Sequence, residues 1–99
     1  MITFFRRVRM LDGCFVEAMS LLRARADYIE RTHGIKVQMH ARFGGPVGEV
    51  AMISQHEDAT DLELFRQKLA ADVGSAKLLK QIAEVTVPGV TCDEIWMSL

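Results

Sequence analysis

The chain has 99 residues, of which 49% are hydrophobic and 25% are charged. This length predicts a single domain over residues 1–99, because chains of this size seldom divide between two cores. Twelve basic and thirteen acidic residues give a formal net charge of −1. That balance argues against non-specific binding to nucleic acid, which requires a basic face.

The N-terminal segment and the cysteines bear on location. The apolar run that begins at Ile2 is too short for a signal peptide and meets Arg6 and Arg7. No stretch of about 18 apolar residues occurs, so we expect neither a membrane span nor a membrane partner. The two cysteines, Cys14 and Cys92, are too few for the disulfide framework of a small secreted domain. We therefore predict a cytoplasmic protein with reduced thiols.

A strand followed by a helix is predicted for the first third of the chain. Residues 2–10 alternate, and four of the five even positions are apolar, so the even side, which includes Arg6, is expected to face the core. Asp12 is the expected N-cap of a helix that ends near His33, with Gly34 as a left-handed C-cap. The apolar stripe of this helix is predicted to comprise Phe15, Met19, Leu22, Ala26 and Ile29, with Glu17, Arg23, Arg25, Asp27 and Glu30 on the other side.

A hairpin follows. Residues 35–43 and 48–56 alternate, and residues 44–47 (GGPV) predict the turn between them. In the register that this turn favours, Arg42 faces Glu49 and Met39 faces Met52, which places opposite charges across the pair.

The last third repeats the pattern of a helix and a strand. Thr60 and Glu63 have the spacing of a capping box that begins a helix through Phe65. Gly74 and Ser75 predict an interruption, with Gly74 as C-cap and Ser75 as a new N-cap. Residues 92–99 are expected to form the closing strand.

This order predicts an α+β fold of ferredoxin-like βαββαβ type, a four-stranded antiparallel sheet with two helices on one face. Nothing in the chain covers the other face, which mixes apolar and charged residues as subunit interfaces do. We therefore expect two copies to pair through their sheets as a dimeric α/β barrel. The predicted interface comprises Phe5, Arg7, Gln38, His40, Arg42, Ile53 and Trp96.

Three segments carry a resemblance to a known family: residues 44–50 (GGPVGEV), residues 62–72 (LELFRQKLAAD) and the Val87-Pro88-Gly89 loop. Together they resemble the NIPSNAP-like branch of the dimeric α/β-barrel superfamily. The resemblance implies this fold and a homodimer, and it brings no settled activity. The superfamily also holds haem-degrading monooxygenases that rely on Asn, Trp and His. This chain has no Asn, and its one Trp, Trp96, lies in the last predicted strand, which speaks against haem degradation.

Two residues are candidates for catalysis. Arg6, on the core side of its strand, requires an anionic or hydrogen-bonding partner. This partner is either a bound anion or a carboxylate of one of the helices, unless a strand bulge turns Arg6 outwards. His56, two residues after Ser54 on the same side, is a candidate general base. The candidate ligand-binding residues in the cleft between sheet and helices are Arg6, Met39, Met52, Ser54, His56 and Phe65.

Three functions remain open. The first is a homodimer that binds a small apolar or aromatic molecule in the sheet–helix cleft. The second is an enzyme of the same superfamily, a cofactor-independent monooxygenase or an isomerase. The third is a non-catalytic structural or interaction module. No spacing of His, Cys, Asp or Glu predicts a metal site, and no cofactor is expected.

Overall fold

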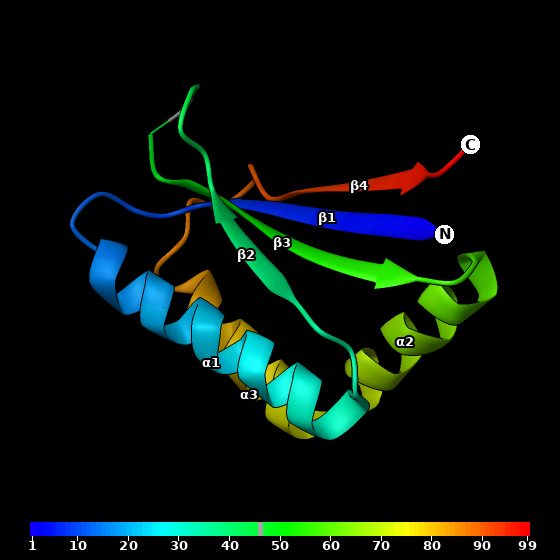
Figure 1. The fold of residues 1–99 in the computed structure, drawn as a ribbon. Helices are drawn as coiled ribbons and strands as arrows, with labels where there is room; N and C mark the ends of the chain where they lie inside the picture. The colour runs from blue at the N-terminus through cyan, green and yellow to red at the C-terminus, as the bar shows by residue number, and fades with distance from the viewer. Residues whose placement is uncertain (46) are drawn as a thin grey trace.

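The computed structural model describes residues 1–45 and 47–99 as one four-stranded sheet with helices on a single face (Figure 1). The elements, in chain order, are β1 (Ile2–Arg9), α1 (Phe15–His33), β2 (Gln38–Ala41), β3 (Glu49–His56), α2 (Ala59–Ala71), α3 (Val73–Ala83) and β4 (Cys92–Met97). The sheet order is β2-β3-β1-β4, and every neighbouring pair is antiparallel. The ferredoxin-like α+β fold predicted from the sequence is thus confirmed, with three helices where two were predicted.

The hairpin register follows the prediction. Met39 pairs with Met52, and the Arg42 amide donates to the Glu49 carbonyl at 2.9 Å. The Arg42 guanidinium also reaches the Glu49 carboxylate at 2.7 Å. β2 is shorter than predicted, and Phe43 lies fully exposed beyond its end. The predicted turn includes Pro46, which lies outside the described residues.

Of the five predicted helix caps, the one at Gly34 is confirmed and the other four differ in the structure. Gly34 ends α1 with φ of 70° and donates to the Glu30 carbonyl, as expected. Asp12, however, lies in a turn with Gly13, whose φ is 82°, so α1 begins only after Cys14. α2 is capped by Asp58, whose carboxylate accepts from the Asp61 amide at 2.8 Å, rather than by a Thr60–Glu63 box.

The break between α2 and α3 lies at Asp72, two residues before the predicted site. Asp72 is extended, and its carboxylate accepts from the Ser75 amide, so it ends one helix and caps the next. Gly74 is therefore helical and not a C-cap. A Cβ at Gly74 would lie 2.4 Å from the Tyr28 hydroxyl oxygen, so glycine is required there by the close approach of α1.

Two groups of buried side chains fill the space between the sheet and the helices. One surrounds Leu22, Val50 and Ile82, and the other joins Ile2, Ile29 and Phe65. The buried face of α1 consists of Ala18, Leu22, Ala26 and Ile29. Phe15, predicted to belong to this stripe, is 56% exposed because it is the first residue of the helix. β4 forms an edge strand, and its Ile95 and Met97 side chains remain exposed.

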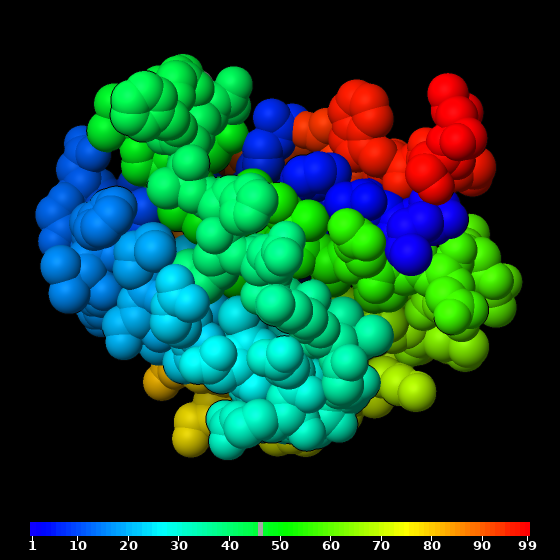
Figure 2. Space-filling model, in the orientation of Figure 1, coloured from blue at the N-terminus to red at the C-terminus, as the bar shows by residue number. Residues whose placement is uncertain are grey.

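The two ends of the chain lie side by side, since the Ser98 amide donates to the Met1 carbonyl at 3.0 Å. In the space-filling view, α1 forms the lower surface, while β4 in red and the residues flanking the hairpin turn in green stand on the opposite side, with β1 in blue between them (Figure 2). Among the described residues, no helix has the length and apolar character needed to cross a membrane.

Candidate functional site

A cavity of about 290 Å³ lies between the inner face of the sheet and the helices. Every layer of the fold contributes to it. Its walls are mainly apolar side chains, namely Phe4, Ile29, Val37, Phe65, Leu69 and Leu79. Five polar side chains also line it, namely Arg6, Arg25, Ser54, Arg66 and Ser75. This combination of apolar walls with a few polar groups is typical of small-molecule sites.

Four of the six predicted ligand-binding residues line this cavity: Arg6, Met52, Ser54 and Phe65. Met39 does not line it and packs instead against the cluster around Leu22 and Val50. His56 does not line the cavity either; it lines a separate surface pocket beside Phe65. The six residues therefore do not form one site.

His56 nevertheless contacts the cavity through Ser54. Its Nε2 lies 2.9 Å from the Ser54 Oγ, and both side chains are buried. The Phe65 ring lies 5.1 Å from the imidazole, centroid to centroid. Burial lowers the pKa of His56 and so favours the neutral imidazole. A neutral imidazole next to a cavity-lining hydroxyl is able to accept a proton from it.

Arg6 has an internal partner. Its guanidinium donates from Nε and Nη2 to the two carboxylate oxygens of Asp93 in β4, at 2.8 and 2.9 Å. This bidentate hydrogen bond raises the pKa of Arg6 and lowers that of Asp93. The partner is a carboxylate of the chain itself, but it belongs to strand β4 and not, as considered from the sequence, to a helix. It comes from the edge strand, where sequence patterning alone did not indicate a match.

Arg25 is the site residue that the sequence reasoning missed. The helical stripe placed it on the polar side of α1, yet it lines the cavity. Its Nη2 donates to the Ser75 Oγ at 3.3 Å, and its Nε is buried without a hydrogen-bond partner among the described residues. Burial, together with the nearby charge of Arg6, lowers the pKa of Arg25. Its position directly beside the buried Ala26 was the available signal that it lies at the border of the stripe.

Asp72 holds Ser75, and with it the wall of the cavity, in place. Its carboxylate accepts from the Tyr28 hydroxyl at 2.6 Å and from the Ser75 amide at 3.1 Å, and contacts His33 Nε2 at 2.7 Å. The hydrogen bond from Tyr28 is the main cause that lowers the pKa of Asp72 to about 2. One carboxylate therefore ties the end of α1 to the junction of α2 and α3.

Because the pKa of Asp72 falls from 3.8 to about 2 on folding, its ionised form stabilises the protein. This stabilisation is complete above the unfolded-state value and is lost as the pH falls from 3.8 towards 2. We expect Asp72→Asn to lower the free energy of unfolding at neutral pH. We expect this gap, the difference in free energy of unfolding between the variant and the wild type, to close below about pH 4. Urea unfolding across this range measures the gap. Asp27→Asn, an exposed position of α1, serves as control; a gap of constant size would contradict the assignment.

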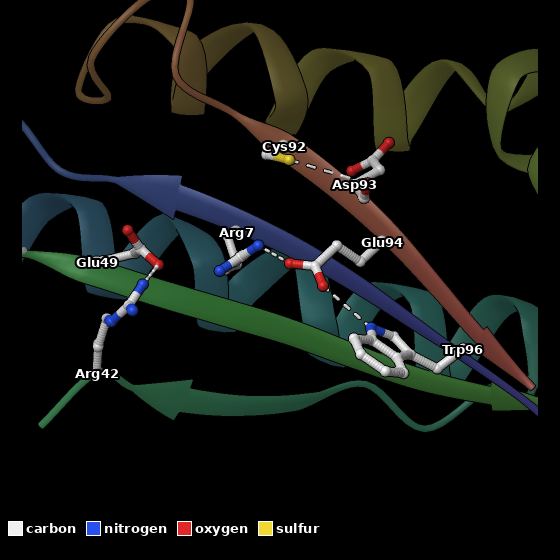
Figure 3. A network of polar contacts seen from close by, with 7 residues as sticks. All are labelled: Arg7, Arg42, Glu49, Cys92, Asp93, Glu94 and Trp96. Atoms are coloured by element: carbon white, nitrogen blue, oxygen red, sulfur yellow. Dashed lines mark hydrogen bonds and ion pairs between the residues drawn. The ribbon is translucent and has the colours of Figure 1, made fainter. Parts of the chain in front are cut away.

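The outer face of the sheet carries a second hollow, lined by Phe5, Arg7, His40, Ala41, Arg42, Glu49, Ala51, Glu94 and Trp96. Figure 3 shows its polar contacts on the face turned away from the helices. Arg7 pairs with Glu94, Arg42 pairs with Glu49, and the Trp96 indole N–H donates to Glu94 at 3.0 Å. The Trp96 side chain is 60% exposed.

The predicted interface residues lie on or beside this hollow, with one difference. Phe5, Arg7, His40, Arg42 and Trp96 line it, and Gln38 is exposed in the neighbouring strand β2. Ile53 alternates onto the same face but is already buried in the single chain, between its strand partners Phe5 and Gln38.

The thiols and possible metal ligands are scattered. Cys14 is half-buried and Cys92 is exposed, and both are free. Within residues 1–45 and 47–99, no three His, Cys, Asp or Glu side chains lie close enough together to hold a metal ion.

Comparison with known proteins identifies the fold. No family model and no curated protein matches this chain. An uncharacterized NIPSNAP domain protein from Burkholderia xenovorans superposes with a TM-score of 0.84 at 16% identity, over 100% of this chain and 95% of that one. A NIPSNAP family protein from Agrobacterium tumefaciens superposes with a TM-score of 0.83 at 19% identity, over 99% of this chain and 92% of that one. A mutant of SnoaB, a cofactor-independent oxygenase from Streptomyces nogalater, superposes with a TM-score of 0.72 at 14% identity, over 98% of this chain and 91% of that one. The chain therefore has the fold of NIPSNAP family proteins and of this oxygenase, which confirms, at the level of fold, the resemblance drawn from the sequence.

Proposed function

We propose that this chain forms a homodimer and binds a small, largely apolar molecule in the cavity between sheet and helices. The observation that carries the proposal is the cavity itself, about 290 Å³ with walls formed mainly by aliphatic and aromatic side chains. The apolar side chains of this open cavity remain in contact with water, and an apolar ligand that covers them is favoured by the hydrophobic effect. Small-molecule sites typically combine such apolar walls with a few polar groups, which orient the ligand and give specificity.

The outer hollow supports the homodimer. Its charged side chains are matched in pairs within the chain, Arg7 with Glu94 and Arg42 with Glu49. The face is thus nearly neutral and exposes Trp96, a residue type enriched in the core of interfaces. A second copy related by a two-fold axis would present the same internally paired charges, so none of these four side chains would enter the interface as an unpaired charge.

Filling the cavity tests the binding function. Ala70 lines the cavity from α2, whereas its neighbour Ala71, which is exposed like Ala70, does not. We expect Ala70→Phe to reduce the affinity for hydrocinnamyl alcohol, a neutral apolar probe, at least about tenfold, because the added ring occupies the space of the ligand. Ala71→Phe should leave the affinity unchanged. Isothermal titration calorimetry measures both. Equal affinities in the two variants would place the binding site elsewhere.

The runner-up function is an enzyme, a cofactor-independent monooxygenase or an isomerase. The observation in its favour is the buried Ser54–His56 pair, which brings a neutral imidazole to the wall of the cavity. The cofactor-independent oxygenase SnoaB shares the fold. The substitution His56→Ala distinguishes the two candidates. It should abolish turnover if the protein is an enzyme, and remove only packing contacts if it is a binding protein. A purely structural module would bind no small molecule in the cavity.

The cytoplasmic location expected from the cysteines stays a prediction.

A further inference from the structure

The charges around the cavity are not balanced. Three guanidinium groups line it, those of Arg6, Arg25 and Arg66, and no carboxylate does so among the described residues. Asp93 lies outside the lining, is engaged by Arg6 through both oxygens, and also feels the charge of Arg66. The other carboxylate beside the lining, that of Asp72, accepts from Tyr28 and from the Ser75 amide and contacts His33. Among the described residues Arg25 therefore has no carboxylate partner, and the cavity is left with an excess of positive charge.

Arg25 is the half-buried cation whose hydrogen-bonding capacity is largely unused, whereas Arg66 is exposed. Its only described hydrogen bond is the 3.3 Å contact from Nη2 to Ser75 Oγ, which is long for a guanidinium. Its Nε is buried and has no partner. A buried donor without an acceptor is destabilising, so an acceptor supplied by a ligand would be favoured at this position.

We propose that the ligand of this cavity is a small apolar acid whose carboxylate binds Arg25. The Nε–H and the neighbouring Nη2–H of an arginine form a fork that matches the two oxygens of a carboxylate. Ser75 Oγ, now an acceptor for Arg25, is placed to donate its hydroxyl proton to the same carboxylate. The inference rests on the proposed binding function and adds to it the chemical class of the ligand.

The remaining walls define the body of this acid. Phe4 and Phe65, with Ile29, Val37, Leu69 and Leu79, offer apolar contact surface. The volume of about 290 Å³ lies at the lower end of the range of ligand pockets, roughly 300–1,000 Å³. The cavity therefore suits an acid with one ring or a short alkyl chain.

The test compares an acid with the matching neutral alcohol. Hydrocinnamate and hydrocinnamyl alcohol differ only at the carbon that bears oxygen, and both are titrated into the wild-type protein and into Arg25→Gln at neutral pH. We expect the wild type to bind the acid at least about tenfold more tightly than the alcohol, because charge-assisted hydrogen bonds to a buried guanidinium are worth that much or more. Arg25→Gln should remove this preference and change the affinity for the alcohol less than about threefold.

Two further variants keep the interpretation specific. Arg23→Gln removes an exposed arginine of the same helix and should leave both affinities unchanged. Asp93→Asn frees Arg6 from its carboxylate, so it should strengthen acid binding and leave alcohol binding unchanged. Because burial and Arg6 already disfavour the charge on Arg25, Arg25→Gln is expected to fold as well as the wild type.

The outcomes separate the two proposals. If the acid and the alcohol bind equally, or if Arg25→Gln keeps the preference for the acid, the assignment of an acid is wrong while the binding function stands. If neither compound binds the wild type, both the acid and the proposed binding function are overturned.

Discussion

Trp96→Glu is expected to convert a dimer into a monomer at micromolar protein concentration. The Trp96 side chain is 60% exposed in the single chain and lines the outer hollow of the sheet. Tryptophan at the centre of an interface typically contributes 2 kcal/mol or more, so its loss alone raises the dissociation constant about thirtyfold. The new carboxylate would also face Glu94, which the indole now contacts. Sedimentation velocity over a concentration series measures the change.

The control for this variant is Val16→Glu. Val16 is 81% exposed on α1, and this helix covers the opposite face of the sheet. The same apolar-to-acidic change at this position should leave the mass of the dimer unaltered. A monomeric wild type, or a Trp96→Glu variant that dissociates no more readily than the wild type, would show that the outer face is not the interface.

Leu22→Ala is expected to lower the free energy of unfolding by about 2–5 kcal/mol. Leu22 is only 3% exposed and packs at the centre of the cluster that joins α1 to β3 and α3. Domains of this size have total stabilities of roughly 5–15 kcal/mol, so the variant loses a large part of its stability. Chemical denaturation followed by circular dichroism gives the value.

Val16→Ala provides the matched control on the same helix. Because Val16 is exposed, its truncation should change the stability by no more than about 0.5 kcal/mol. A cost below about 1 kcal/mol for Leu22→Ala would mean that α1 does not pack on the sheet through this side chain.

The parts of the fold set by local chemistry were predictable from the sequence. Gly34 ends α1 because a left-handed residue is required there, and glycine adopts that conformation without strain. The hairpin register follows from alternation and from the opposite charges of Arg42 and Glu49. These signals depend only on residues that are neighbours in the chain or lie in directly paired strands, so they can be read from the sequence alone.

Features that depend on distant contacts were predicted less well. The break at Asp72 is fixed by Tyr28 and His33, more than thirty-five residues earlier in the chain, as well as by its local cap on Ser75. Because Asp72 ends α2 and caps α3, Gly74 lies inside α3, and the Tyr28 hydroxyl occupies the space that a side chain at Gly74 would take. Local patterning favoured Gly74 and Ser75 as the break because glycine and serine are common at helix ends, and no local signal reveals a tyrosine from another helix.

The candidate site shows the same division. Alternation placed Arg6 and Ser54 on the inner face of the sheet, where both line the cavity. A helical stripe has two borders, and only packing decides which border is covered. Since α1 packs against α3, the border of the apolar stripe that holds Arg25 is covered. Arg25, which was expected at the surface, therefore lines the cavity.

Native mass spectrometry of gently purified protein, followed by denaturation of the same sample, tests the central claim most directly. The account predicts the mass of a dimer with an additional small component, which on denaturation is released as an organic acid. A monomer that carries no small component at micromolar concentration would contradict both the paired sheets and the occupied cavity.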